Sequence, residues 1–264
     1  MALQLGVLVL FAVVAVVVFL VGDRFRPVSW QREDDEGAHG MVLDMVNMFF
    51  AAIVAFVVVI LWQQYDTATA HTVAEGKALV VAYETAGDLP DADRARVQGL
   101  VREYTEQVVT VEWVAMRDQK SLSEGTQQTF DDLRAAVAAV QSADPAVLDA
   151  QQEIDESLDA VAEARYDRAL DAGYSLPVFL YIALWFGTVM LLAGGVFSGV
   201  MVTRRSVVMT AMFGFVVGAI VLTIYKLDRP FAGWNMVSRE AYELALARFQ
   251  QIASAESASN ALPR

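Results

Sequence analysis

Four long stretches of the chain are apolar and almost free of charge. They cover Leu5–Gly22, Met41–Leu61, Leu176–Val202 and Val207–Tyr225. A helix needs about 20 apolar residues to cross the roughly 30 Å hydrocarbon layer of a bilayer, and each stretch is long enough. The buried helices of a soluble protein would carry polar residues at every turn or so, and these stretches do not. We therefore predict a multi-pass membrane protein with four transmembrane helices.

The segment between the second and third stretches has a different composition. Residues 66–175 contain 22 acidic and 9 basic residues, whereas the rest of the chain contains 10 of each. The whole formal charge of −13 therefore belongs to the inserted segment. Such a charge repels nucleic acid, which we do not expect as a partner. Two interpretations stay open for it, an attraction of cations and an ordinary solvated acidic surface.

The inserted segment shows helical patterns and no strand pattern. The second apolar stretch continues without a proline as far as Gly87–Pro90, which predicts a long helix that leaves the membrane. Asp144 followed by Pro145 is a typical helix start, and Gly173 is a typical helix end. We predict an all-α protein in which an antiparallel helical bundle is inserted between spans 2 and 3. Its parts are residues 1–65 with spans 1 and 2, 66–175 with the bundle, 176–226 with spans 3 and 4, and 227–264 with an amphipathic C-terminal segment.

The chain lacks the patterns that carry catalysis or bind cofactors. It has no cysteine and only two histidines, and no phosphate loop, zinc-ligand spacing or nucleophile motif is present. His71 has no partner at ligand spacing, and we expect it to be solvated. The sequence therefore predicts no enzyme activity, no catalytic residue, no metal site and no cofactor.

The second span offers a candidate ion pathway. Asp44, Asn47, Ala51, Ala55 and Val58 fall on one face of a helix, which is polar at one end and lined by small or apolar residues beyond it. An ionisable residue in a membrane span is a functional candidate, and this face could form the polar mouth and apolar constriction of a pore. The alternative is that Asp44 lies near the headgroups and helps to cap the helix. In the fourth span Thr210, Gly214 and Gly218 recur every four residues, which favours close helix packing.

Motifs spread over Met41–Gln250 together resemble the bestrophin-like family of bacterial and plant membrane proteins. The most specific is Leu227-Asp228-Arg229-Pro230-Phe231-Ala232-Gly233 at the end of the fourth span. The chain departs from the family at Gly76-Lys77, where Ala-Asn often follows the glutamate, and at Arg229, where an aromatic residue is frequent. The residues that carry the resemblance, to which we assign a structural role, are Glu75, Leu89, Pro90, Tyr104, Glu112, Trp113, Pro177, Asp228, Pro230, Phe231 and Gly233.

The resemblance implies an oligomeric ion channel, selective for anions and homopentameric, with the second span lining the pore. Its partners would be the lipid bilayer, further copies of the chain and inorganic ions. The acidic bundle would instead favour cations, so the sign of the ion stays open. An alternative function is an envelope sensor or scaffold that binds a partner through the acidic bundle. Arginines in the two short loops place those loops in the cytoplasm, and the bundle and both termini outside the cell membrane.

Overall fold

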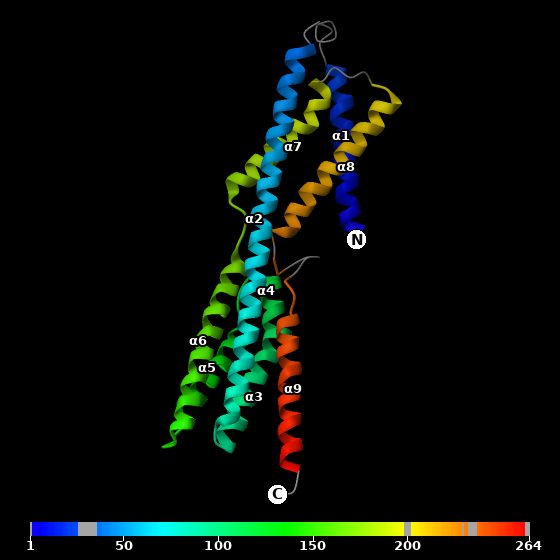
Figure 1. The fold of residues 1–264 in the computed structure, drawn as a ribbon. Helices are drawn as coiled ribbons and strands as arrows, with labels where there is room; N and C mark the ends of the chain where they lie inside the picture. The colour runs from blue at the N-terminus through cyan, green and yellow to red at the C-terminus, as the bar shows by residue number, and fades with distance from the viewer. Residues whose placement is uncertain (1, 26–35, 198–201, 229, 232–236, 262–264) are drawn as a thin grey trace. The chain divides into compact units, whose positions relative to one another are not determined.

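The computed structural model describes residues 2–25, 36–197, 202–228, 230–231 and 237–261. The chain divides into two compact units, which are described separately (Figure 1). Unit 1 comprises Met1–Gln63 and Ser175–Asp228, and unit 2 comprises Gln64–Tyr174 and Arg229–Arg264. All regular structure in the described residues is helical, which confirms the predicted fold class.

Unit 1 contains α1 (Ala2–Phe25), the first part of α2 (Glu36–Thr85), α7 (Val178–Phe197) and α8 (Arg204–Leu227). Small residues let α1 and α8 approach closely: a Cβ atom added to Gly214 would lie only 2.5 Å from the Cβ of Ala15, and one added to Gly218 only 2.7 Å from that of Phe11. The glycine spacing of the fourth span thus serves packing within one chain. Helices α2, α7 and α8 share an apolar core, which includes Phe50, Val57, Leu61, Leu180, Leu184, Val217 and Ile224.

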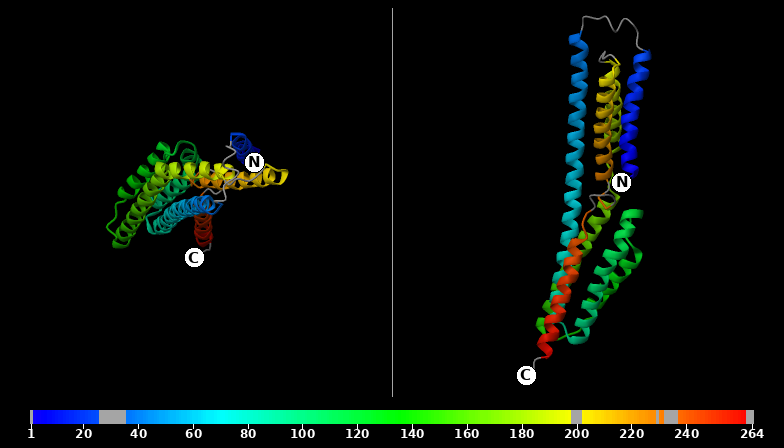
Figure 2. Two further views of the ribbon diagram at one scale, coloured as in Figure 1. Left: turned by 90° about the horizontal axis from the view of Figure 1, so that it is seen from above. Right: turned by 90° about the vertical axis from the view of Figure 1, so that its right-hand side faces the viewer.

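Four helical stretches in the described residues are long and apolar enough to cross a membrane. They are Gln4–Phe25, a part of Asp44–Asp88, a part of Pro145–Gly194, and Arg204–Leu227. The predicted four spans are therefore confirmed as helices of suitable length and composition. Helix α2 continues without a break from Glu36 to Thr85, as the sequence predicted, and the right-hand view of Figure 2 shows it along its length.

In its described residues, unit 2 is built from the second part of α2 and five further α-helices. They are α3 (Asp91–Gln107), α4 (Trp113–Gln119), α5 (Glu124–Ala138), α6 (Pro145–Gly173) and α9 (Glu240–Ala261). A 3₁₀ turn, Ala86–Asp88, ends α2, and a π-helical turn, Val108–Glu112, joins α3 to α4. Asp144 caps α6 as predicted, because its carboxylate accepts a hydrogen bond of 3.0 Å from the backbone of Ala146.

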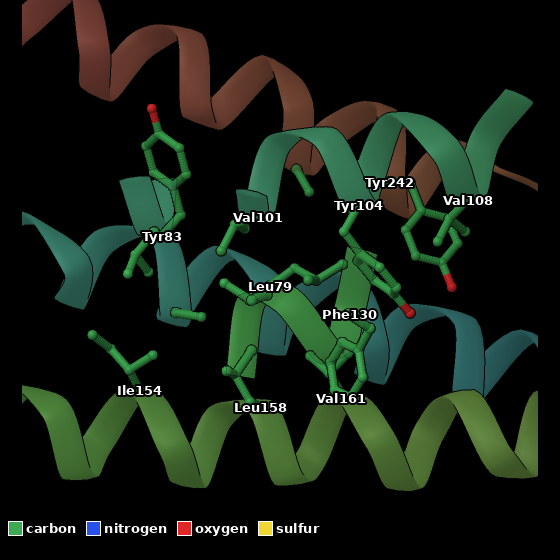
Figure 3. Packing of buried hydrophobic residues seen from close by; sticks show 14 of the residues in the cluster. Leu79, Tyr83, Val101, Tyr104, Val108, Phe130, Ile154, Leu158, Val161 and Tyr242 are labelled. Carbon is green, nitrogen blue, oxygen red and sulfur yellow. The ribbon is translucent and has the colours of Figure 1, made fainter. Parts of the chain in front are cut away.

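An apolar core runs through unit 2. Leu79 and Tyr83 of α2 meet Val101 and Tyr104 of α3 and Phe130 of α5, and α6 contributes Ile154, Leu158 and Val161 (Figure 3). Helix α9 joins the same core, where its Phe249 stacks on Tyr83 with ring centroids 4.3 Å apart. The C-terminal segment therefore folds as part of the helical bundle.

Candidate functional site

Within the described residues, no other helix covers the predicted pore face of α2. Asp44, Asn47, Ala51, Ala55 and Val58 are all exposed. The residues of α2 that unit 1 buries, listed above, lie on a different side of the helix, about a quarter of a turn away from this face. The face is therefore free to meet water, lipid or another copy of the chain.

One end of this face borders a cleft between α2 and α8. The cleft has a volume of about 300 Å³ and is almost entirely apolar. Val54 and Val58 form its α2 wall, and Phe215, Ala219 and Thr223 belong to its α8 wall. Val58 thus lies at the edge of the candidate pathway that turns towards α8, whereas Asp44 and Asn47 lie three to four turns away along α2.

A network of buried charges lies inside unit 2, and Arg168 of α6 is at its centre. The side chain of Arg168 is completely buried. Its Nε and Nη2 donate to the two carboxylate oxygens of Glu75 at 2.9 and 3.2 Å, and Nη2 also donates to Glu112 Oε1 at 2.7 Å. Nη1 lies 3.3 Å from the sulfur of Met116. Burial of an ion costs several kcal/mol, and only such close pairing offsets that cost.

Arg165, one turn before Arg168, completes the network. Its Nη2 donates to Glu112 Oε2 at 2.6 Å, and its Nη1 is bonded to the side-chain oxygen of Gln127. The hydroxyl groups of Tyr104 and Tyr242 donate to Glu75 at 2.7 and 2.8 Å. Two glutamates and two arginines balance, so the buried network has no net charge. It joins α2, α3, the π-helical turn, α5, α6 and α9.

The charges of the network shift the pKa values of its members in consistent directions. Burial alone would raise the pKa of Glu112, but Arg168 and Arg165 outweigh it and lower that pKa. Burial lowers the pKa of Arg168, yet Glu75 and its neighbours raise it well above the ordinary value. Burial, together with the charge of Glu75, raises the pKa of Tyr104, and burial raises that of Tyr242 as well. The arginines and Glu112 are therefore charged, and both tyrosines are protonated, at neutral pH.

The π-helical turn places Glu112 in this network. A π turn inserts an extra residue into a helix and so rotates the residues that follow it, and such turns are frequent at functional sites. Here Glu112 and Trp113 are adjacent in sequence and both are buried. Trp113 packs edge-on against Phe231 and Tyr242, with ring centroids 5.4 and 6.0 Å apart.

The structure brings most of the residues that carry the family resemblance into two places. The first is the ionic network, where Glu75, Tyr104, Glu112, Trp113 and Phe231 meet.

Three other signature residues lie elsewhere in unit 2. Leu89 is buried and Pro90 precedes α3, where they form the turn out of α2. The carbonyl oxygen of Pro230 accepts a hydrogen bond from the backbone of Val237 at 2.8 Å. Gly233 lies outside the described residues.

The second place is an anchor in unit 1, where the end of α8 meets the start of α7. Asp228 is buried, and its carboxylate accepts hydrogen bonds from the backbone N–H of Leu176 at 2.7 Å and from the hydroxyl of Tyr181 at 2.5 Å. Pro177, which is exposed, precedes the first residue of α7. The two signature segments, Leu176-Pro177 and Asp228, are thus in direct contact, and this contact fixes where α7 begins.

His71 was expected to be solvated; its side chain is 28% exposed but also has partners on α6, which the sequence did not indicate. Its Nδ1 lies 2.8 Å from Asp171 Oδ2 and its Nε2 lies 3.7 Å from Asp167 Oδ2, so α2 is bonded to α6. Gln64 donates to the other oxygen of Asp171 at 2.9 Å. These two acidic residues of α6 lie about 100 positions away in sequence, and no local spacing could indicate them.

The sequence did not single out Arg168 or Tyr242 as members of a site. A signal for the arginines was present, because Arg165 and Arg168 continue the three- and four-residue spacing of Ile154, Leu158 and Val161. That spacing puts both on the buried face of α6. An arginine on an apolar face requires a buried acid, and Glu75 and Glu112 were the two family-signature acids predicted to lie within the helical bundle.

In the described residues the helices define an all-α membrane protein with four helices of spanning length and a helical bundle inserted in sequence between the second and the third. A family model, the Bestrophin-like domain, matches residues 9–242. The chain therefore belongs to the bestrophin-like family. Its fold is similar to that of a mutant bacterial bestrophin homologue from Klebsiella pneumoniae, with 12% sequence identity, a TM-score of 0.66, and coverage of 93% of this chain and 98% of that one. No curated protein sequence matches the chain significantly.

Proposed function

We propose that the protein is an oligomeric ion channel in the cell membrane, and that the membrane part of α2 lines its pore. The observation that carries the proposal is the uncovered face of α2. It holds the polar residues Asp44 and Asn47, whereas the residues that the chain buries lie on another side of the same helix. Membership of the bestrophin-like family supports the proposal.

The high free energy of a charged residue in a bilayer favours an assembly of several copies, in which this face lies against water instead of lipid. A carboxylate in the hydrocarbon layer costs about 3 kcal/mol or more, and this cost is avoided when the residue faces water. A single copy leaves Asp44 exposed, whereas a ring of copies would enclose the five α2 residues around a common axis. The family relation implies five copies. The small side chains of Ala51 and Ala55 would let neighbouring α2 helices approach closely, as a narrow pore requires.

Asp44 gives the proposal its sharpest test. A ring of carboxylates at a pore mouth attracts cations, and neutral side chains there do not. Purified protein in liposomes should conduct ions, and Asp44→Asn should lower the permeability to sodium or potassium relative to chloride. Asp155→Asn, which removes the same charge from an exposed position of α6, is the matched control and should leave this ratio unchanged. A monomeric protein without chloride or cation flux would refute the channel, and the bundle would then be tested as a partner-binding module.

The proposed orientation places unit 2 and both termini outside the cytoplasm. The chain contains no cysteine, so one cysteine introduced at Ala143, in the exposed turn before α6, reports its side of the membrane without background. An impermeant maleimide should label Ala143→Cys in intact cells. Labelling only after permeabilisation would reverse the orientation and leave the channel proposal untouched.

A further inference from the structure

His71 of α2 lies between two carboxylates of α6, the helix that runs beside α2 in unit 2 (Figure 1). Its Nδ1 is 2.8 Å from Asp171 Oδ2, and its Nε2 is 3.7 Å from Asp167 Oδ2. The side chain of Asp171 is only 7% exposed, whereas that of His71 is 28% exposed. Water can therefore exchange a proton with the imidazole while its nearest carboxylate partner stays buried.

The protonation state of the imidazole decides how many of these carboxylates it can bind. A carboxylate only accepts hydrogen bonds, and a neutral imidazole has a single N–H, so it donates to one carboxylate at a time. The distance of 2.8 Å assigns that proton to Nδ1, which donates to Asp171. The lone pair of Nε2 then faces the negative charge of Asp167, which repels it. A second proton turns this repulsion into an ion pair between α2 and α6.

The carboxylate of Asp171 holds α2 at two points. Gln64 donates to its Oδ1 at 2.9 Å, and His71 bonds its Oδ2. Gln64 and His71 are seven residues apart, which places them two turns apart on the same side of α2. Asp171 belongs to the last turn of α6, which ends at Gly173. The bonds to His71 therefore attach the end of α6 to α2.

The neighbouring charges of the ionic network are already paired with one another. Glu75 lies one turn after His71 on α2, but Arg168 and the two tyrosines bond its carboxylate. Arg168 itself bonds Glu75 and Glu112. In the part of the chain that the structure describes, the charged groups in contact with His71 are thus the two aspartates of α6. Histidine is the side chain whose charge ordinarily changes between pH 5 and 8.

We propose that His71 is a proton-dependent latch between α2 and α6. In its protonated state it binds both Asp167 and Asp171 and holds the end of α6 against α2. In its neutral state the bond to Asp171 remains, the contact with Asp167 is lost, and the end of α6 opens more often. The latch is therefore closed at acidic pH and weakens as the pH rises through the range in which histidine loses its proton. It is a property of unit 2 and does not depend on the proposed channel.

Amide hydrogen exchange of the full-length protein in detergent tests the latch, because it reports local opening of a helix. Wild type and His71→Gln are compared at the same pH, first at about pH 5.5 and then at about pH 8. Glutamine can still donate one hydrogen bond to Asp171 but cannot gain a proton. The last turn of α6 should exchange about fivefold faster in the variant at the lower pH, and less than about twofold faster at the higher pH. Asp167→Asn should show the same pattern, because it removes the second partner alone.

Two controls separate the latch from a general effect of pH. Arg248 pairs with Glu84 at 2.6 Å at an exposed site, and neither side-chain type ordinarily changes its charge between pH 5.5 and 8. Arg248→Gln should therefore change the exchange of the surrounding α9 amides by the same factor at both pH values. In His71→Gln the buried middle of α6, around Ile154 and Leu158, should exchange as in the wild type. An effect of His71→Gln that is equal at both pH values, or larger at the higher one, overturns the latch.

The latch also has a consequence for ion flux, and this consequence rests on the proposed function. Helix α2 is the helix to which we assign the pore, so a pH-dependent attachment to α6 should make conduction depend on pH. In liposomes, the flux through the wild type should change by about twofold or more between pH 5.5 and 8, and the change should be smaller in His71→Gln. The same pH dependence in both proteins would refute the link to conduction and leave the channel intact. If no flux occurs at either pH, the channel is refuted, and hydrogen exchange still decides whether the latch exists.

Discussion

Removal of the central arginine of unit 2 should destabilise the protein strongly. Arg168→Met keeps much of the side-chain volume but removes the guanidinium group, which is fully buried and donates to both Glu75 and Glu112. Glu75 would keep only the two tyrosine hydroxyl groups as partners, and it would be a buried charge without a counter-ion. The loss of one partner from a buried ion pair costs about 3–5 kcal/mol. For a unit of this size, that corresponds to a fall in melting temperature of about 6–20 °C.

The measurement is thermal unfolding of the full-length protein in detergent, followed by circular dichroism. Arg248→Met is the control, because Arg248 pairs with Glu84 at 2.6 Å between the same kinds of side chain but at an exposed site. An exposed pair contributes about 0–1 kcal/mol, so this change should lower the melting temperature by no more than about 4 °C. Adding Glu75→Gln to Arg168→Met should recover part of the loss, because the unpaired charge is removed. Equal effects of the two arginine variants, or no recovery, would refute the role assigned to Arg168.

Three further predictions concern pH, the α7 anchor and the contact of α2 with α9. Burial raises the pKa values of Tyr104 and Tyr242 in the folded state, so the stability that these residues contribute is present below pH about 10 and is lost as the pH rises above it. The free energy of unfolding should fall by up to about 3 kcal/mol per pH unit in that range. Alkaline unfolding of the wild type and of the two Tyr→Phe variants measures this fall. Asp228→Ala should destabilise the protein by about 1–3 kcal/mol and lower its melting temperature accordingly, because a buried backbone N–H and a tyrosine hydroxyl lose their acceptor. An unchanged melting temperature would contradict the role of Asp228 as an anchor. Gly76→Leu should push α9 away from α2 and destabilise unit 2, whereas Gly99→Leu, on an open face of α3, should be neutral or stabilising.

The sequence predicted the elements well because each depends on local signals. Four apolar stretches, a helix end at Gly87–Pro90 and a start at Asp144-Pro145 all act over a few residues, and the structure has helices that begin and end there. The uncovered face of α2 was also predictable, since five residues at helical spacing share a face wherever the helix lies. The surroundings of that face depend on other helices and on other copies, and the spacing of residues within one helix gives no information about them.

The ionic network was only half predictable because it is assembled from residues far apart in sequence. Glu75 and Arg168 are separated by 93 positions, and Glu75 and Tyr242 by 167. The resemblance supplied Glu75, Tyr104 and Glu112 without saying what holds them together. The partner that the two glutamates share, Arg168, became evident only when α6 was placed beside α2 and the π-helical turn.

The composition of the network explains why it determines the arrangement of unit 2 more strictly than an apolar core could. Apolar side chains tolerate small shifts of a helix along its axis, because one contact replaces another at little cost. The fork of Arg168 bonds Glu75 on one element and Glu112 on another, and a shift of α6 by one turn would break both pairs while leaving all three charges buried. Each misplaced pair would cost several kcal/mol, so alternative packings of these helices are strongly disfavoured. A lysine at position 168 could not replace the arginine, because a single ammonium group lacks the planar fork that reaches both carboxylates.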